Sequence, residues 1–162
     1  MQRIRVILAD DHTVVREGLR ALLETDSSME VVGEAEDGEE AVQLAKQLSP
    51  DVAVLDILMP RMNGIKATRQ IVEAVPTTRV LILSSYDSDD YIQELTQAGA
   101  AGYLLKQAAA KDFLKAIHEI DEGNAFFSPA VARRLRDQCR ESLMSGQPVS
   151  RCQPVYAESW SQ

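Results

Sequence analysis

The stretch from Val52 to Gly64, VAVLDILMPRMNG, decides the fold. Its first four residues are apolar, and such a continuous run is typical of a strand that is buried on both faces of a parallel sheet. The run stops at one carboxylate, Asp56, after which Pro60 and Gly64 interrupt regular structure. We therefore expect a strand, a loop and a helix, with a polar site where the strand ends.

Outside this stretch, four further segments have strand character. The predicted strands are Ile4–Ala9, Glu30–Glu34, Val52–Asp56, Val80–Ser84 and Tyr103–Lys106, of which Glu30–Glu34 is the weakest and is expected nearer an edge. Five strands that alternate with helices predict an α/β fold with a doubly wound, five-stranded parallel sheet. The flavodoxin-like strand order 2-1-3-4-5 is assigned by analogy.

Apolar residues recur at helical spacing between these strands and place one face of each helix on the sheet. They are Val15, Leu19, Leu22 and Leu23; Ala41, Leu44, Ala45 and Leu48; Thr68, Ile71, Val72 and Val75; Ile92 and Leu95; and Phe113, Leu114 and Ile117.

The end of the chain differs from this alternating part. Ser128 and Pro129 have the residue types of an N-cap and a first helical position, and they predict an additional helix over residues 128–144. Its arginines form either a solvated face, which we favour, or an interaction surface. Residues 145–162 show no period and are predicted to be a flexible tail. The domain prediction is thus 1–127, then the added helix, then the tail.

Composition excludes several classes of protein. The 162 residues carry a formal net charge of −8 with an isoelectric point near 4.8, which argues against direct nucleic acid binding by this chain. No apolar run approaches the roughly 18–20 residues of a membrane span. Cys139 and Cys152 have neither metal-site spacing nor a disulfide framework, and we interpret them as free thiols of a cytoplasmic protein.

Polar residues stand at the ends of the predicted strands. Asp10 and Asp11 follow the first, Asp56 ends the third, Ser84 the fourth and Lys106 the fifth. The carboxyl ends of parallel strands share one edge of the sheet, so these groups should converge. Crowded carboxylates repel unless a divalent cation neutralises them, and oxygen ligands suit Mg²⁺. The metal and the lysine could then bind a phosphoryl group.

Taken together, these motifs resemble the receiver domain of bacterial response regulators, in particular the NarL/FixJ-type subfamily. The resemblance covers about residues 1–138 and rests on ILADDH, LDILMPRMNG, VLILSSYD, GAAGYLLK and AIHEIDEGNAFFSPAVARRL. It implies that Asp56 is the phosphoacceptor. It also implies that Asp11, Asp56 and the backbone carbonyl of Leu58 bind Mg²⁺, with Asp10 assisting, for instance through water.

The resemblance assigns further roles beside the acceptor. Lys106 is similar to the lysine that pairs with the carboxylate and then with the phosphate. Ser84 resembles the switch hydroxyl, and Tyr103 the aromatic residue that rotates with it. Pro60 and Gly64 shape the loop after the acceptor.

A sensor histidine kinase or a phosphotransfer protein is the implied phosphodonor, and a partner or a second copy of the chain is the implied output. The resemblance implies a switch whose only chemistry is its own phosphorylation and dephosphorylation, not an enzyme. His12 is expected at the start of the first helix and His118 on the surface.

Two features depart from the family pattern. Gln107 stands where many receivers have a proline after the lysine, and we expect a trans bond there because a cis non-proline bond costs roughly 2.5–4 kcal/mol. Nothing after Leu143 resembles the helix-turn-helix output domain of the subfamily.

Three other functions compete with the phosphoacceptor role. The chain could be the regulatory N-terminal part of a DNA-binding transcriptional regulator whose output domain is absent here. A haloacid dehalogenase-type phosphatase would also use an aspartate and Mg²⁺, but it needs a second acid two residues later, where this chain has Leu58. A degenerate receiver is disfavoured because every expected chemical group is present.

Overall fold

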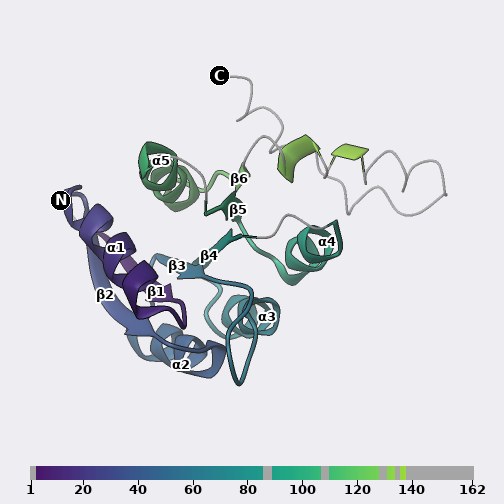
Figure 1. The fold of residues 1–162 in the computed structure, drawn as a ribbon, viewed down its shortest axis with the longest axis horizontal. Coiled ribbons are helices and arrows are strands. Elements are labelled where there is room, and N and C mark those ends of the chain that lie inside the picture. The colour runs from purple at the N-terminus through teal and green to yellow at the C-terminus, as the bar shows by residue number, and fades with distance from the viewer. Residues whose placement is uncertain (1–2, 86–88, 107–109, 128–130, 134–135, 138–162) are drawn as a thin grey trace.

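The structure, a computed structural model, describes residues 3–85, 89–106, 110–127, 131–133 and 136–137. Strands and helices alternate along the chain (Figure 1). The elements are β1 Ile4–Ala9, α1 Thr13–Glu24, β2 Met29–Ala35, α2 Gly38–Leu48, β3 Val52–Leu55, α3 Gly64–Ala74, β4 Arg79–Ser84, α4 Asp89–Ala98, β5 Gly102–Leu105, α5 Ala110–Asp121 and β6 Phe126–Phe127.

All strands of the sheet are parallel and follow the order β2-β1-β3-β4-β5-β6. The predicted flavodoxin-like order is confirmed, and β2 is the edge strand that the sequence indicated. The sixth strand was missed because β6 has two residues, too few to show a period. It pairs with β5 through Gly102 and Phe126, and a Cβ on Gly102 would lie 2.5 Å from the Phe126 carbonyl oxygen.

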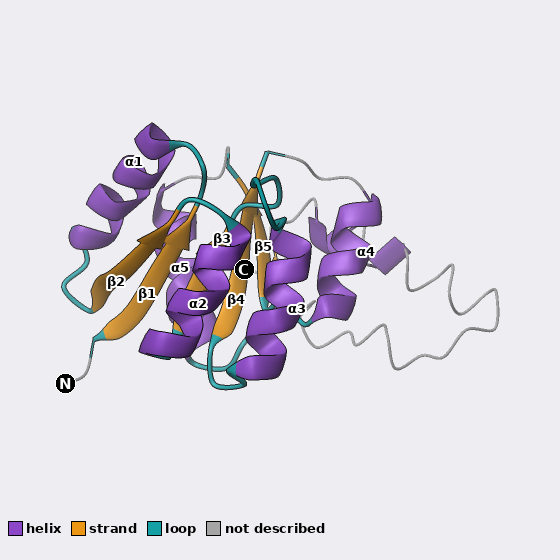
Figure 2. Cartoon of the chain, turned by 90° about the horizontal axis from the view of Figure 1, so that it is seen from below, coloured by secondary structure: helices purple, strands orange, loops and turns teal. Residues whose placement is uncertain are grey.

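Helices cover both faces of the sheet, with α1 and α5 on one face and α2, α3 and α4 on the other (Figures 1 and 2). Two buried apolar clusters correspond to these faces. Leu23 and Ile117 belong to the α1/α5 cluster, whereas Ala45, Ile71 and Ile92 belong to the α2/α3/α4 cluster. The apolar faces predicted from helical spacing therefore pack on the sheet, although Val15 belongs to neither cluster.

His118 connects α5 to the loop before β2. Its Nε2 lies 2.9 Å from Asp26 Oδ2, and Ser28 Oγ donates a hydrogen bond to the other oxygen of the same carboxylate. These contacts, with the Ser28 hydrogen bond the largest, lower the pKa of Asp26 to about 2. His118 is thus a surface residue, as expected, but it has a defined acidic partner.

The segment after β6 is described only in part. Residues 131–133 and 136–137 are helical, and Val131 and Ala132 are buried in the α2/α3/α4 cluster with Phe127. The rest of the predicted helix 128–144, the predicted tail 145–162, both cysteines and the bond to Gln107 lie outside the described residues. No helix in the described ranges is long and apolar enough to cross a membrane.

Candidate functional site

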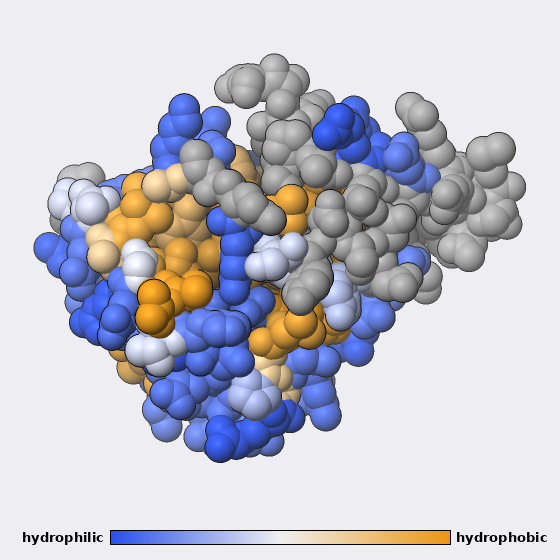
Figure 3. Space-filling view, in the orientation of Figure 1, coloured by the Kyte–Doolittle hydropathy of each residue, from blue (hydrophilic) through white to orange (hydrophobic). Residues whose placement is uncertain are grey.

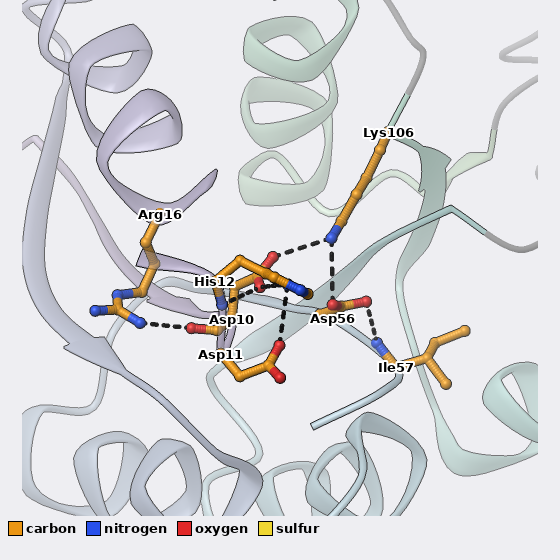
Figure 4. A network of polar contacts seen from close by, with 7 residues as sticks. All are labelled: Asp10, Asp11, His12, Arg16, Asp56, Ile57 and Lys106. Atoms are coloured by element: carbon orange, nitrogen blue, oxygen red, sulfur yellow. Dashed lines mark hydrogen bonds and ion pairs between the residues drawn. The ribbon is translucent and has the colours of Figure 1, made fainter. Parts of the chain in front are cut away.

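Side chains from β1, β3 and β5 meet at the carboxyl ends of these strands. Asp10 follows β1, Asp56 follows β3 and Lys106 follows β5. Lys106 Nζ donates to Asp10 Oδ2 at 3.1 Å and to Asp56 Oδ2 at 3.2 Å (Figure 4). The parallel register places Asp10 beside Asp56, because Ala9 pairs with Leu55, and Lys106 directly follows the last residue of β5 at the same edge of the sheet.

Asp56 is held by contacts to both of its carboxylate oxygens. Its residue exposure is 7 %, and Oδ1 accepts a hydrogen bond from the Ile57 amide at 2.8 Å while Oδ2 faces Lys106. Burial raises the pKa of Asp56, the charge of Lys106 opposes this rise, and the charge of Asp10 adds to it. The ionisation of Asp56 therefore depends on a nearby cation.

Lys106 supplies that cation. Burial alone would lower its pKa, but the hydrogen bond to Asp10 and the charges of Asp56 and Asp10 outweigh burial and raise the pKa above its usual value. The ammonium group remains protonated at neutral pH and neutralises part of the acidic charge.

Asp11 and His12 complete an acidic group that could hold a metal ion. One side-chain ligand atom from each of Asp10, Asp11, His12 and Asp56 lies within 4.8 Å of the others. His12 is the N-cap residue of α1, and its Nδ1 lies 3.1 Å from both Asp10 Oδ1 and Asp11 Oδ1. The carboxylate oxygens match the hard donors that Mg²⁺ prefers.

The prediction that His12 stands at the start of the first helix is confirmed. Its contacts with Asp10 and Asp11 were not predicted. Its direct position after Asp10 and Asp11 was the signal available.

The remaining predicted site residues lie around this group. Leu58 follows Asp56 by two residues and its side chain is 45 % exposed. Its backbone carbonyl stays a predicted metal ligand. Ser84 ends β4 and is fully buried. Tyr103 is 1 % exposed and belongs to the α2/α3/α4 cluster. The ring therefore lies in the core of this structure, and its rotation together with Ser84 stays a prediction.

The loop between β3 and α3 is anchored at both ends. The Gly64 amide donates to the Ile57 carbonyl at 2.8 Å, and the Gly38 amide donates to the Met62 carbonyl at 3.1 Å. The Arg61 guanidinium pairs with the buried carboxylate of Asp37, the N-cap residue of α2. The Glu40 amide and then Arg61 lower the pKa of Asp37. These contacts hold the segment that follows Asp56.

Gly64→Ala is expected to destabilise the protein by about 1–3 kcal/mol and to slow any reaction at Asp56. A Cβ at this position would lie 2.2 Å from the Asp56 carbonyl oxygen, so the backbone that carries the acid must shift. Thermal or urea unfolding measures the effect. Gly18→Ala is the matched control: no atom lies within 4 Å of its added Cβ, and alanine should stabilise α1. Equal effects of both substitutions would contradict the packing argument.

Arg16 is a residue of the site that the sequence did not reveal. It lies on α1, is 8 % exposed and donates from Nη1 to the Asp10 carbonyl oxygen at 2.6 Å (Figure 4). A signal existed, because Arg16 stands seven residues before the buried Leu23 and thus shares its helix face. A charged residue on a buried face requires a partner.

Comparison with known protein families shows to which family the chain belongs. The response regulator receiver domain matches residues 6–118, which is well over half of the chain. The chain belongs to the response-regulator receiver family. Receiver domains of this family are components of two-component systems and are phosphorylated on an aspartate, and as a class they are not enzymes that act on separate substrates.

Individual relatives of the receiver are transcriptional regulators. The chain is 38 % identical over 138 residues to the transcriptional regulatory protein DegU of Brevibacillus brevis, with 85 % of this chain and 58 % of the relative covered. It is 42 % identical over 139 residues to LiaR of Bacillus subtilis, with 86 % and 66 % covered. The chain thus spans about three fifths of the length of such relatives.

Solved structures agree with the receiver fold. A LuxR-family two-component response regulator from an Aurantimonas species matches with a TM-score of 0.80 and 34 % identity, covering 85 % of this chain and 98 % of that one. The signal receiver domain of a NarL regulator from Mycobacterium tuberculosis matches with a TM-score of 0.73 and 38 % identity, covering 76 % and 100 %. The predicted NarL/FixJ-type resemblance is confirmed.

Proposed function

We propose that this receiver takes a phosphoryl group onto Asp56 from the phosphohistidine of a sensor kinase or a phosphotransfer protein in the cytoplasm. The observation that carries the proposal is the setting of Asp56, a buried carboxylate with Oδ1 on the Ile57 amide and Oδ2 on Lys106. The neighbouring Asp10 and Asp11 supply acidic oxygens for a metal.

In this reaction an oxygen of Asp56 attacks phosphorus, the bond from phosphorus to the donor nitrogen breaks, and an acyl phosphate forms. Lys106 moves from pairing with the carboxylates to pairing with a phosphoryl oxygen. Mg²⁺, held by Asp11, Asp56 and the Leu58 carbonyl with help from Asp10, would stabilise the charge on the phosphoryl oxygens.

The surface beside the acceptor supports contact with a protein donor. Figure 3 shows apolar side chains interrupting the polar surface of the face drawn. Val14 and Leu58 are the large apolar side chains with the most exposure in the described part of the chain, at 81 % and 45 %. Val14 follows the acidic pair closely in sequence and Leu58 follows Asp56, so both suit a partner that approaches the acceptor.

A regulatory role in a longer DNA-binding regulator is the second candidate, because the relatives are described as transcriptional regulatory proteins. In that case phosphorylation of the receiver would control DNA binding by another domain. The haloacid dehalogenase alternative finds no support at position 58, where Leu58 cannot act as a general acid.

The test is to incubate the purified chain with acetyl phosphate and Mg²⁺ and to measure its intact mass and its oligomeric state. We expect one added phosphoryl group, no labelling when EDTA removes the metal, and a change from monomer to dimer or in partner binding. A chain that gains no phosphoryl group under these conditions would disprove the proposed function.

Asp11→Ala is expected to weaken Mg²⁺ binding at least about tenfold, because it removes a direct oxygen ligand. The fold should keep its stability without metal or gain slightly, since one like charge is removed beside Asp10. Calorimetric titration with Mg²⁺ measures the affinity. Glu17→Ala removes the same charge from an exposed position of α1 and should leave the affinity unchanged. An unaltered titration of the Asp11 variant would exclude a ligand role.

Ser84→Ala is expected to accept phosphate but to lose phosphate-dependent dimerisation or partner binding. A phosphoryl group on Asp56 offers acceptor oxygens that the Ser84 hydroxyl can bind, and the resulting shift would be passed to Tyr103 and the surface formed by α4, β5 and α5.

Labelling and oligomeric state are measured on one Ser84→Ala sample, with the exposed neighbour Ser85→Ala as control. If the Ser84 variant dimerises on phosphorylation as the wild type does, this coupling is not the signalling route.

A further inference from the structure

Arg16 is a buried cation whose partners lie at the ends of two strands. Its side chain is 10 % exposed, and it extends from α1 toward the segments that follow β1 and β2. Nη1 donates to the Asp10 carbonyl oxygen at 2.6 Å, Nε donates to Glu34 Oε1 at 3.4 Å, and Nη2 lies 3.8 Å from Glu36 Oε1. Burial of a guanidinium costs free energy unless several such contacts compensate for it.

Asp10 is held through all four of its polar atoms. Its amide donates to the Ala35 carbonyl at 3.1 Å, Oδ1 accepts from the His12 amide at 2.9 Å, and Oδ2 accepts from Lys106 at 3.1 Å. Arg16 provides the donor for the remaining atom, the carbonyl oxygen. Arg16 thus contacts the peptide that joins Asp10 to Asp11.

Arg20 shows which of these contacts is specific to Arg16. It lies one helical turn further along α1, donates to Glu34 Oε2 at 2.6 Å and to Glu24 Oε1 at 3.2 Å, and is 50 % exposed. Both arginines pair with Glu34, yet in the described part of the chain only Arg16 also donates to Asp10. If Arg16 served only to pair with Glu34, Arg20 would have the same role.

We infer that Arg16 is a positioning residue for the acidic pair, and that it holds the Asp10–Asp11 peptide so that both carboxylates face Asp56. The inference rests on the proposed function, because the purpose of that orientation is to bind a divalent cation for phosphoryl transfer. Outer contacts of this kind orient metal ligands, and their loss typically weakens metal binding 10- to 100-fold.

The experiment compares Arg16→Met with Arg20→Met, and adds Arg16→Lys as a variant that keeps the buried charge. In the metal-free protein, the NMR signals of the Asp11 and His12 amides should shift in both Arg16 variants and stay in place in the Arg20 variant. Calorimetry should show Mg²⁺ binding about tenfold weaker in Arg16→Met, less weakened in Arg16→Lys, and unchanged in Arg20→Met.

Labelling with acetyl phosphate separates positioning from a general loss of structure. The Mg²⁺ concentration for half-maximal labelling should rise about tenfold in Arg16→Met, in step with the affinity, while the rate at saturating Mg²⁺ stays at the wild-type value. A loss of maximal rate with unchanged half-saturation would overturn the inference, and so would equal Mg²⁺ affinities in the two methionine variants.

The amide signals are read without metal, so they judge Arg16 even if the wild type binds no Mg²⁺. A wild-type protein that binds no Mg²⁺ would refute the proposed function. Unmoved Asp11 and His12 amides in the Arg16 variants would refute the positioning role.

Discussion

Replacement of Asp56 by asparagine is expected to abolish labelling of the protein by acetyl phosphate and Mg²⁺. The amide cannot act as the attacking oxygen nucleophile, although it has nearly the size of the carboxylate and keeps an oxygen for the Ile57 amide. Intact mass after incubation measures the result. Asp51→Asn is the matched control, because Asp51 directly precedes β3 and Asp56 directly follows it. The Asp51 carboxylate accepts a hydrogen bond from the Arg5 amide, which asparagine can also accept.

The control variant should be labelled at the wild-type rate. A phosphoryl group on the Asp56→Asn protein at that rate would show that another residue is the acceptor, and peptide mapping would then identify it.

The same substitution has a pH-dependent effect on stability. The pKa of Asp56 is raised in the folded protein, so the folded state binds the proton more tightly than the unfolded state does. The free energy of unfolding of the metal-free wild type therefore falls as pH rises from the ordinary carboxyl pKa near 3.9 to the raised pKa of Asp56. Above the raised pKa this loss of stability stays constant. Asp56→Asn removes this cost, and its stability advantage in EDTA should appear over that window and persist at neutral pH.

The strands themselves and the convergence of Asp10, Asp56 and Lys106 could be predicted because they depend on local pattern, whereas the order of the strands was assigned by analogy. Each strand is a short apolar run that ends in a polar residue, and parallel strands bring such ends to one edge. The structure shifts individual strand ends by one residue, so that Asp56 and Lys106 lie just beyond β3 and β5. That shift leaves the convergence intact.

Contacts between distant side chains were not predictable from pattern. Arg61 pairs with Asp37, 24 residues earlier, and neither residue belongs to a periodic set. Arg16 could have been suspected from its helix face, but its acceptor is a backbone carbonyl, which no side-chain spacing indicates. The burial of Tyr103 likewise depends on the α2/α3/α4 cluster, which includes residues from α4 and from the segment after β6.

Lys106→Met is expected to lower the stability of the metal-free protein by about 2 kcal/mol. The substitution leaves Asp10 and Asp56, whose side chains are 3 % and 8 % exposed, without their shared cation. Breaking a buried pair costs roughly 3–5 kcal/mol, and the partial exposure of Lys106 reduces that figure through solvent screening. Unfolding in EDTA measures it. Adding Asp10→Asn to the variant should restore most of the loss, because one of the two repelling charges is then gone.

Measurements with Mg²⁺ distinguish two roles of Lys106, which are to balance the charge of the acids and to act in phosphoryl transfer. Because Mg²⁺ would neutralise the same carboxylates, it should stabilise Lys106→Met more than it stabilises the wild type. Labelling by acetyl phosphate at saturating Mg²⁺ should nevertheless stay about 10²–10³-fold slower, since the metal does not replace the ammonium group on its phosphoryl oxygen. A variant whose labelling returns to the wild-type rate with Mg²⁺ would show that Lys106 only balances the charge of the acids. A variant that regains stability but not rate would show that the ammonium group acts in the transfer itself.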